Sequence, residues 1–217
     1  MTKSKSRFQE YFEAIVIALI LALFIRAFVI QAFKIPSGSM IPTLLIGDHI
    51  LVNKFIYGIR IPFTDKKLFT FKKPQREDVI VFIYPEDHSK DFIKRVIGEE
   101  GDTVLIKGKR VYINGEVYSD PCGHYMDDTP GSGGFPRRDF GPITIPKDSV
   151  FVLGDNRDNS RDSRFWGFVP LNLVRGKAFM IYWSNGSPQR RDPWNIPAKI
   201  LDAIWYNRWY RMGDFIH

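Results

Sequence analysis

The chain has 217 residues, of which 44% are hydrophobic and 25% charged, a composition that excludes a wholly disordered protein. Its formal net charge of +7 is compatible with anionic lipid or nucleic acid as a partner, or with solubility alone. The single cysteine, Cys122, excludes an intrachain disulfide, and the 4 histidines form no His-Glu-x-x-His or Cys/His cluster. We therefore expect neither a metal site nor a cofactor.

The first predicted element is a transmembrane helix at residues 14–33, in which only Arg26 and Gln31 are polar. Twenty helical residues span about 30 Å, the thickness of the hydrocarbon core of a bilayer. A cleaved signal peptide would have a shorter apolar core and small residues at its end, so we expect this segment to be retained. The alternative is a buried helix of a soluble protein. Because Lys and Arg flank both ends, charge alone leaves the orientation open.

The rest of the chain, residues 34–217, is predicted to be mostly β-structure. Short runs rich in β-branched and aromatic residues, separated by Pro, Gly and Asp turns, occur at residues 48–54, 78–84, 90–97 and 149–153. Residues alternate between apolar and polar in the segments 102–106, 110–113 and 116–118, and Asn114-Gly115 is typical of a hairpin turn. This pattern predicts a β-meander. Residues 118–147 are rich in Pro and Gly and are predicted to form a long insert.

The last 35 residues contain many aromatic and basic side chains, including Trp183, Trp194, Trp205 and Trp209. Such a composition is typical of a surface that contacts lipid headgroups. Closure of a β-domain core by the same aromatic residues is an equally good interpretation.

The sequence has no Gly-x-Ser-x-Gly elbow, Walker A motif or Gly-x-Gly-x-x-Gly motif, but three polar segments interrupt its apolar strands. They are Pro36–Thr43, Lys94-Arg95 and Gly154–Arg164. Neighbouring residues on a strand point to opposite faces, so either Lys94 or Arg95 is expected to face inward. A buried lysine has a lowered pKa and can take the proton of a serine hydroxyl. The alternative for Lys94 alone is a solvated strand lysine, and the residues alone do not distinguish Ser37 from Ser39.

These three segments resemble, in the same order, the motifs of bacterial type I signal (leader) peptidases. The family motifs are Pro-Ser-Gly-Ser-Met-x-Pro-Thr-Leu, Lys-Arg-x-x-Gly and Gly-Asp-Asn-Arg-Asp-Asn-Ser-x-Asp-Ser-Arg, and all three are present here. The resemblance also includes residues 76–82 and 165–170, and so covers most of the chain. Glu77 departs from it, because a small residue is common at that position.

The resemblance implies a role for seven residues. Ser39 would be the nucleophile and Lys94 its general base, a Ser/Lys dyad. Ser37 would supply the oxyanion-hole hydroxyl beside the backbone amide of Ser39. Three residues would support the base, with Ser160 orienting the lysine amine and Asp162 and Arg164 holding the structure around it. Met40 would line the substrate groove, although plain core packing is an equally good interpretation.

The implied protein is a membrane-anchored serine endopeptidase that cleaves signal peptides from exported preproteins after small residues of the Ala-x-Ala type, through an acyl-enzyme. The implied fold is mostly β, with coiled antiparallel sheets forming a catalytic domain, a smaller β extension at about residues 103–147 that includes the insert, and one preceding transmembrane helix. Residues 1–13 would be cytoplasmic, and residues 34–217 would lie on the outer side of the cytoplasmic (inner) membrane.

The expected partners are signal peptides and the phospholipid bilayer, with no nucleic acid, and we expect a monomer. Two alternatives remain from the residues. One is a regulatory Ser/Lys autoprotease of the SOS-repressor type, which would carry a DNA-binding module that is not visible here. The other is a non-enzymatic membrane-bound binding module, which the dispersed basic residues do not favour.

Overall fold

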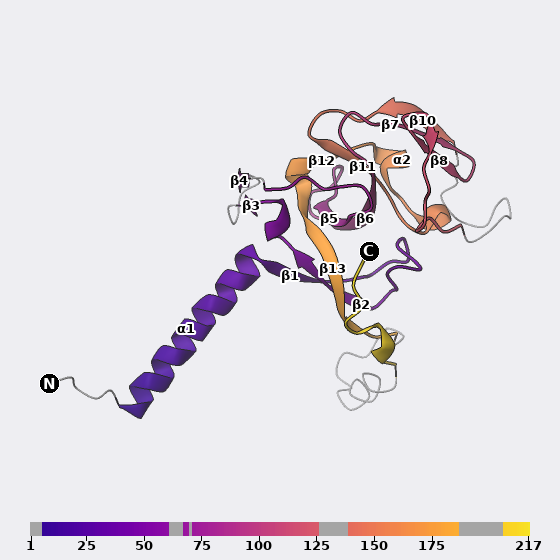
Figure 1. Ribbon diagram of the computed structural model, residues 1–217. Coiled ribbons are helices and arrows are strands. Elements are labelled where there is room, and N and C mark those ends of the chain that lie inside the picture. The colour runs from indigo at the N-terminus through magenta and orange to yellow at the C-terminus, as the bar shows by residue number, and fades with distance from the viewer. Residues whose placement is uncertain (1–5, 61–66, 70, 126–138, 187–205) are drawn as a thin grey trace.

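The computed structural model describes residues 6–60, 67–69, 71–125, 139–186 and 206–217. One long helix, α1 (Arg7–Phe28), projects from a body of strands (Figure 1). The strands, in chain order, are β1 (Ile30–Lys34), β2 (Asp48–Asn53), β3 (Ile59–Arg60), β4 (Lys67–Phe69), β5 (Val79–Ile83), β6 (Asp91–Gly98), β7 (Thr103–Lys107), β8 (Arg110–Ile113), β9 (Glu116–Val117), β10 (Phe140–Thr144), β11 (Ser149–Leu153), β12 (Val169–Pro170) and β13 (Val174–Ser184). Short helical turns are η1 (Phe55–Tyr57), η2 (Arg157–Asn159), α2 (Ser163–Trp166), η3 (Leu171–Leu173) and η4 (Trp209–Arg211).

Helix α1 starts at a capping box, in which the side chains of Ser6 and Gln9 each accept a hydrogen bond from the other residue's backbone N–H. Its mean hydropathy reaches 2.2, and none of its residues is buried by the rest of the protein. It is the one helix in the described part of the chain that is long and apolar enough to cross a membrane. Its 22 residues correspond to about 33 Å of helix.

The bounds of this helix differ from the predicted 14–33, since it starts at Arg7 and ends at Phe28. The C-terminal part of the apolar run, Ile30–Lys34, is strand β1 and pairs with β2. Hydropathy cannot separate these two elements, because an apolar strand beside an apolar helix gives the same signal. The backbone groups of residues 30–34 find partners in the ladder with β2.

Most of the strands belong to one seven-stranded sheet with the order β1-β2-β13-β5-β6-β11-β12. A second sheet has the order β10-β7-β8-β9, and β3 pairs with β4 alone. Every strand pairing is antiparallel, which confirms the predicted mostly β, antiparallel class. The four-stranded sheet comes from residues 103–144, and residues 126–138 of the predicted insert lie outside the described residues.

Strands β5 and β11 are buried along their whole length, because both faces of the large sheet are covered. On one side lies a cluster that includes Met40, Ile50 and Ile181; on the other lies a cluster around Phe82 and Val152. A third cluster joins the large sheet to the four-stranded sheet. Buried apolar strands of this kind stabilise the fold and hold β6 between β5 and β11, inside the sheet.

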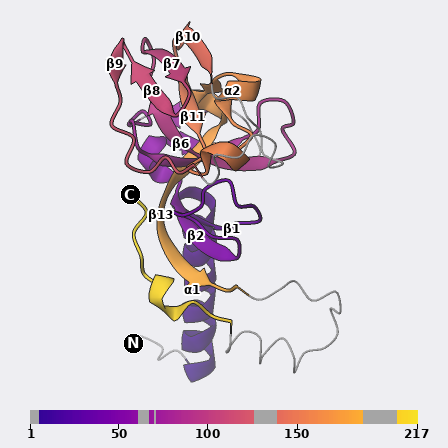
Figure 2. The same ribbon diagram turned by 90° about the vertical axis from the view of Figure 1, so that its right-hand side faces the viewer.

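After β13, the segment 206–217 returns along the sheet, where it forms a bridge between Met180 and Phe215 (Figure 2). Within it Trp209 is 58% exposed and contacts Trp183 edge to face. Of the aromatic residues predicted to contact lipid or close the core, Trp194 and Trp205 lie outside the described residues.

Candidate active site

The loop between β1 and β2 carries Ser39. Two backbone hydrogen bonds close the base of the loop. The N–H of Ile35 donates to the carbonyl of Asp48 (2.8 Å), and the N–H of Gly47 donates to the carbonyl of Ile35 (3.0 Å). Met40 and Leu44 are fully buried in the core and anchor the loop from within. The loop is therefore held both by its ends and by its apolar side chains.

Lys94 reaches this loop from the centre of β6. Its Nζ donates to Ser39 Oγ over 2.8 Å and to the carbonyl of Ile93 over 2.8 Å. Ser39 is 8% exposed and Lys94 is 4% exposed. The structure thus brings together the two residues that the sequence predicts as nucleophile and base.

Arg95 is buried as well, on the opposite face of the same strand. The sequence predicts that one of these two cations faces inward, and in the structure both side chains are buried. Strand β6 lies between β5 and β11, with covered faces on both sides, so both side chains enter the interior. A strand inside a covered sheet has no solvent face for the second cation.

Burial lowers the pKa of Lys94 to about 8, because the ammonium loses its hydration. The negative charges of Asp162 and then Asp155 act in the opposite direction and raise the pKa, but by less than burial lowers it. With this pKa about a tenth of the amine is neutral at pH 7, and a neutral amine can accept the Ser39 proton.

The loop after β11 holds the Ser39 loop through two residues, Asp155 and Asn156. Asp155 accepts two hydrogen bonds from Arg95, both 2.8 Å, and one from Thr43 Oγ1 at 2.6 Å. Asn156 donates from Nδ2 to the carbonyl of Gly38 and from its backbone N–H to the carbonyl of Ser39, both over 3.1 Å. The nucleophile's own backbone is thus fixed by the loop that follows β11.

These supporting residues were missed as functional candidates, although all lie inside the quoted motifs. The available signal was chemical: a charged residue, Arg95, next to Lys94 inside an apolar strand, and an acidic residue, Asp155, two positions after the strand run 149–153. Such a pattern predicts a buried ion pair, since an unpaired buried charge is costly.

Asp162 and Arg164 form a second buried pair behind the base. Arg164 donates from Nε to Asp162 Oδ1 (2.8 Å) and from Nη2 to Asp162 Oδ2 (2.9 Å) and to the carbonyl of Arg157 (2.6 Å). Asp162 also caps α2 and accepts from the backbone N–H of Gly154 over 3.1 Å. The pair therefore braces the 154–164 loop.

Ser160, Ser37 and Met40 occupy less direct positions. Ser160 is fully buried, and among the described residues its hydroxyl has no hydrogen-bond partner, so it makes no hydrogen bond to Lys94 here. Ser37 is exposed on the loop, two residues before Ser39. Met40 packs in the core cluster with Ile50.

A metal ion has no ready site in the described part of the chain, which contains no group of three or more His, Cys, Asp or Glu side chains able to hold one. The side chains of the site themselves offer a hydroxyl nucleophile and an amine base. A serine hydroxyl in contact with a desolvated amine is the arrangement required for acyl transfer without histidine.

Most of this chain is similar in sequence to known proteins. Residues 8–183 match the family model described as signal peptidase, peptidase S26. The signal peptidase I of Pseudomonas aeruginosa is 40% identical over 83% of this chain and 74% of its own length, and that of Aquifex aeolicus is 34% identical over 90% and 93%. A crystal structure of a signal peptidase I from Enterococcus faecalis V583 is 34% identical and covers 50% of this chain and 98% of its own, with a TM-score of 0.39. The chain therefore belongs to the signal peptidase family, peptidase S26, and is a serine endopeptidase anchored to a membrane.

Proposed function

We propose that this protein removes signal peptides from exported preproteins with Ser39 as nucleophile and Lys94 as general base. The observation that carries the proposal is the 2.8 Å hydrogen bond between Lys94 Nζ and Ser39 Oγ in a buried setting. The lowered pKa of Lys94, about 8, supports it, because a protonated amine cannot act as a base.

In the proposed reaction, neutral Lys94 takes the proton of Ser39 as Oγ attacks the scissile carbonyl carbon. The tetrahedral intermediate collapses when the Lys94 ammonium gives that proton to the leaving amine, which breaks the C–N bond and leaves an acyl-enzyme on Ser39. Lys94 then deprotonates a water molecule that attacks the ester, and Ser39 regains its proton.

The oxyanion of the intermediate would accept hydrogen bonds from the Ser37 hydroxyl and from the backbone N–H of Ser39. Each such donor lowers the barrier by about 3 kcal/mol in comparable enzymes. The supporting observation is that Asn156 holds the carbonyls of Gly38 and Ser39, which fixes the orientation of the peptide planes on either side of Ser39. A preorganised donor needs no rearrangement during the reaction.

The proposed substrate has small side chains, of the Ala-x-Ala type, at the residues one and three before the cut. We place the catalytic domain on the outer side of the cytoplasmic (inner) membrane, with one membrane crossing by α1, and propose a monomer. The short connection from Phe28 to Ser39 supports cleavage close to the membrane surface, because eleven residues keep Ser39 within about 40 Å of the helix end even if fully extended.

The test is cleavage of a preprotein with an Ala-x-Ala site in detergent. Ser39→Ala and Lys94→Met are expected to abolish cleavage, and Lys94→Arg is expected to do the same because a guanidinium stays protonated. Ser37→Ala is expected to retain partial activity, since one oxyanion donor remains. Lys107→Met, at an exposed strand position, is the matched control and should cleave normally. Wild-type cleavage by Lys94→Met would rule out the dyad.

Specificity needs a second experiment, with the enzyme unchanged and the substrate varied. Replacing either Ala of the site by Phe should prevent cleavage by the wild-type enzyme. A mass increase on Ser39, equal to the acyl part of the substrate, is expected in reactions quenched with acid. Cleavage that tolerates Phe at both positions would contradict the proposed specificity.

A further inference from the structure

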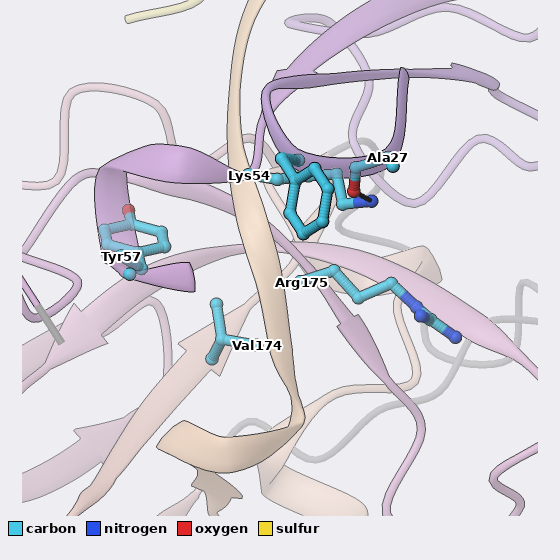
Figure 3. Close-up of a pocket in the computed structure, with 7 residues that line it drawn as sticks. Ala27, Lys54, Tyr57, Val174 and Arg175 are labelled. Carbon is cyan, nitrogen blue, oxygen red and sulfur yellow. Dashed lines mark hydrogen bonds between the residues drawn. The ribbon is translucent and has the colours of Figure 1, made fainter. Parts of the chain in front are cut away.

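One side chain, Lys54, joins the end of the anchor helix to the catalytic domain. Its Nζ donates to the carbonyl of Ala27 over 2.6 Å, and its backbone N–H donates to the carbonyl of Val29 over 2.9 Å. In Figure 3 the Lys54 side chain extends to the Ala27 carbonyl. The last carbonyls of a helix have no partners within it and carry partial negative charge, so an ammonium at this point stabilises the helix end.

Only the end of the helix is covered at this junction. No residue of α1 is buried, and only its last two residues, Ala27 and Phe28, are half-buried. They line a small pocket with Tyr57, Val174 and Arg175 (Figure 3). Besides this limited packing, the direction of the helix relative to the domain depends on polar contacts, of which Lys54 supplies two.

The same junction lies at the base of the hairpin that carries Ser39. Strands β1 and β2 pair from Ile30 opposite Asn53, beside Lys54, to Lys34 opposite His49, and the Ser39 loop connects their other ends. The strands turn away from the direction of the helix axis rather than continuing it (Figure 1). A change in angle at Lys54 would therefore move Ser39 towards or away from the membrane.

We propose that Lys54 is a positioning residue that sets the angle between α1 and the β1–β2 hairpin, and so selects which bond of a membrane-held signal peptide reaches Ser39. This inference rests on the proposed function. A substrate whose apolar stretch is in the bilayer presents its bonds at fixed distances from the membrane surface. The enzyme can choose among them only if its own nucleophile is also held at a fixed level.

The size of the effect follows from the length of the β1–β2 hairpin between the junction and the Ser39 loop. Five strand residues span about 17 Å, so a change of about 20° at the junction moves the tip by about 6 Å. That displacement equals about two residues of an extended substrate. Loss of the hydrogen bond from Lys54 Nζ to the Ala27 carbonyl should therefore shift cleavage by one or two bonds rather than abolish it.

The experiment uses the full-length protein in lipid vesicles and a preprotein with two Ala-x-Ala sites, of which the wild type prefers one. A short soluble peptide with the preferred site is the second substrate. Lys54→Met is expected to cleave the peptide within about twofold of wild type, but to raise the fraction of preprotein cut at the other site by about threefold or more, because a charged hydrogen bond is lost. Lys54→Arg, which keeps the charge and the reach, should restore the wild-type choice.

Arg175→Met is the matched control, since Arg175 lines the same pocket but pairs with Asp91 over 2.6 Å rather than with the helix. It should keep the wild-type site choice. An unchanged site choice in Lys54→Met would overturn the proposal and leave the proposed function intact. Equal loss on both substrates would also overturn it, because Lys54 would then support the active site itself. Absence of preprotein cleavage by the wild type would overturn the proposed function together with this inference.

Discussion

The guanidinium of Arg95 forms two parallel hydrogen bonds with the carboxylate of Asp155, each 2.8 Å long, and the two side chains are 1% and 0% exposed. Arg95 directly follows Lys94 on β6, and Asp155 also accepts a hydrogen bond from Thr43 in the Ser39 loop. The ion pair therefore joins the strand that carries the lysine to the loop that carries the serine.

Replacing Asp155 with Ala leaves the buried Arg95 guanidinium without its counter-ion. We expect a loss of about 3–5 kcal/mol in the free energy of unfolding, the usual cost of breaking a buried pair. Denaturant unfolding in detergent measures it, and cleavage activity should fall as the Ser39 loop loosens. Lys90→Ala, which removes an exposed pair with Asp87, should cost less than about 1 kcal/mol. Equal stability of the two variants would contradict the role given to the buried pair.

The activity should depend on the protonation of Lys94, whose pKa is lowered to about 8. We expect kcat/KM for a soluble peptide to rise with pH, with a midpoint near this value, and to fall about tenfold for each pH unit below it. Stopped assays across the range from acidic to alkaline buffer measure the profile. A profile with a midpoint near the ordinary lysine pKa would show that burial does not tune the base.

Asp162→Asn provides a directional test of the same electrostatics. The carboxylate of Asp162 raises the pKa of Lys94, so its removal should move the midpoint of the profile to lower pH. The unpaired charge of Arg164 would act in the same direction. The maximal rate is expected to fall because the 154–164 loop loses the ion pair between Asp162 and Arg164. A lower maximal rate does not by itself move the midpoint of the pH profile. A shift to higher pH would contradict this assignment of charges.

The sequence was sufficient to predict the antiparallel β class and to mark the segments that meet at the site. Composition and periodicity are local properties, and they recognise apolar strands and a polar interruption wherever these occur. The contact between Lys94 and Ser39 joins residues 55 positions apart, and their pairing came from the family resemblance. Periodicity says nothing of which strands become neighbours.

Other details depended on tertiary structure. The end of α1 at Phe28 is set by the ladder between β1 and β2, which hydropathy does not register. The burial of both Lys94 and Arg95 follows from the central place of β6 in the sheet, whereas a single strand predicts one buried face. The role of Asn156 required coordinates, because it acts on backbone carbonyls that have no signature in the sequence.

Lys94 should make the protein less stable at neutral pH than a variant without this charge. Its folded-state pKa of about 8 lies below the unfolded value of 10.5, so between these pH values the unfolded chain binds more protons and stability rises with pH. Below about pH 8 the buried group costs about 3 kcal/mol, at 1.36 kcal/mol for each pKa unit. Lys94→Met should therefore be more stable than wild type at pH 7.

The difference in unfolding free energy between Lys94→Met and wild type should shrink between pH 8 and 10.5, since the wild-type amine becomes neutral over this range. Denaturant unfolding at several pH values provides the measurement. Lys107→Met, at an exposed position, should differ from wild type by a constant amount. A pH-independent difference for Lys94→Met would mean that its pKa is the same in the folded and unfolded states.

Gly154 lies where the loop after β11 meets the Ser39 loop, and it has no room for a side chain. A Cβ at this position would lie 2.2 Å from Ser160 Oγ and 2.5 Å from the carbonyl oxygen of Ser39. The second contact is with backbone, so Gly154→Ala must displace the nucleophile. We expect the rate of peptide cleavage to fall about 100-fold, as for other displacements of a catalytic group by about 1 Å.

Gly101→Ala is the comparison variant, because its Cβ would meet nothing within 4 Å and only its φ of +86° is unfavourable. It should lose about 1 kcal/mol of stability and keep its cleavage rate. Equal cleavage by the two variants would mean that the Ser39 loop can shift without harm, contrary to the tight positioning that an acyl-transfer reaction requires.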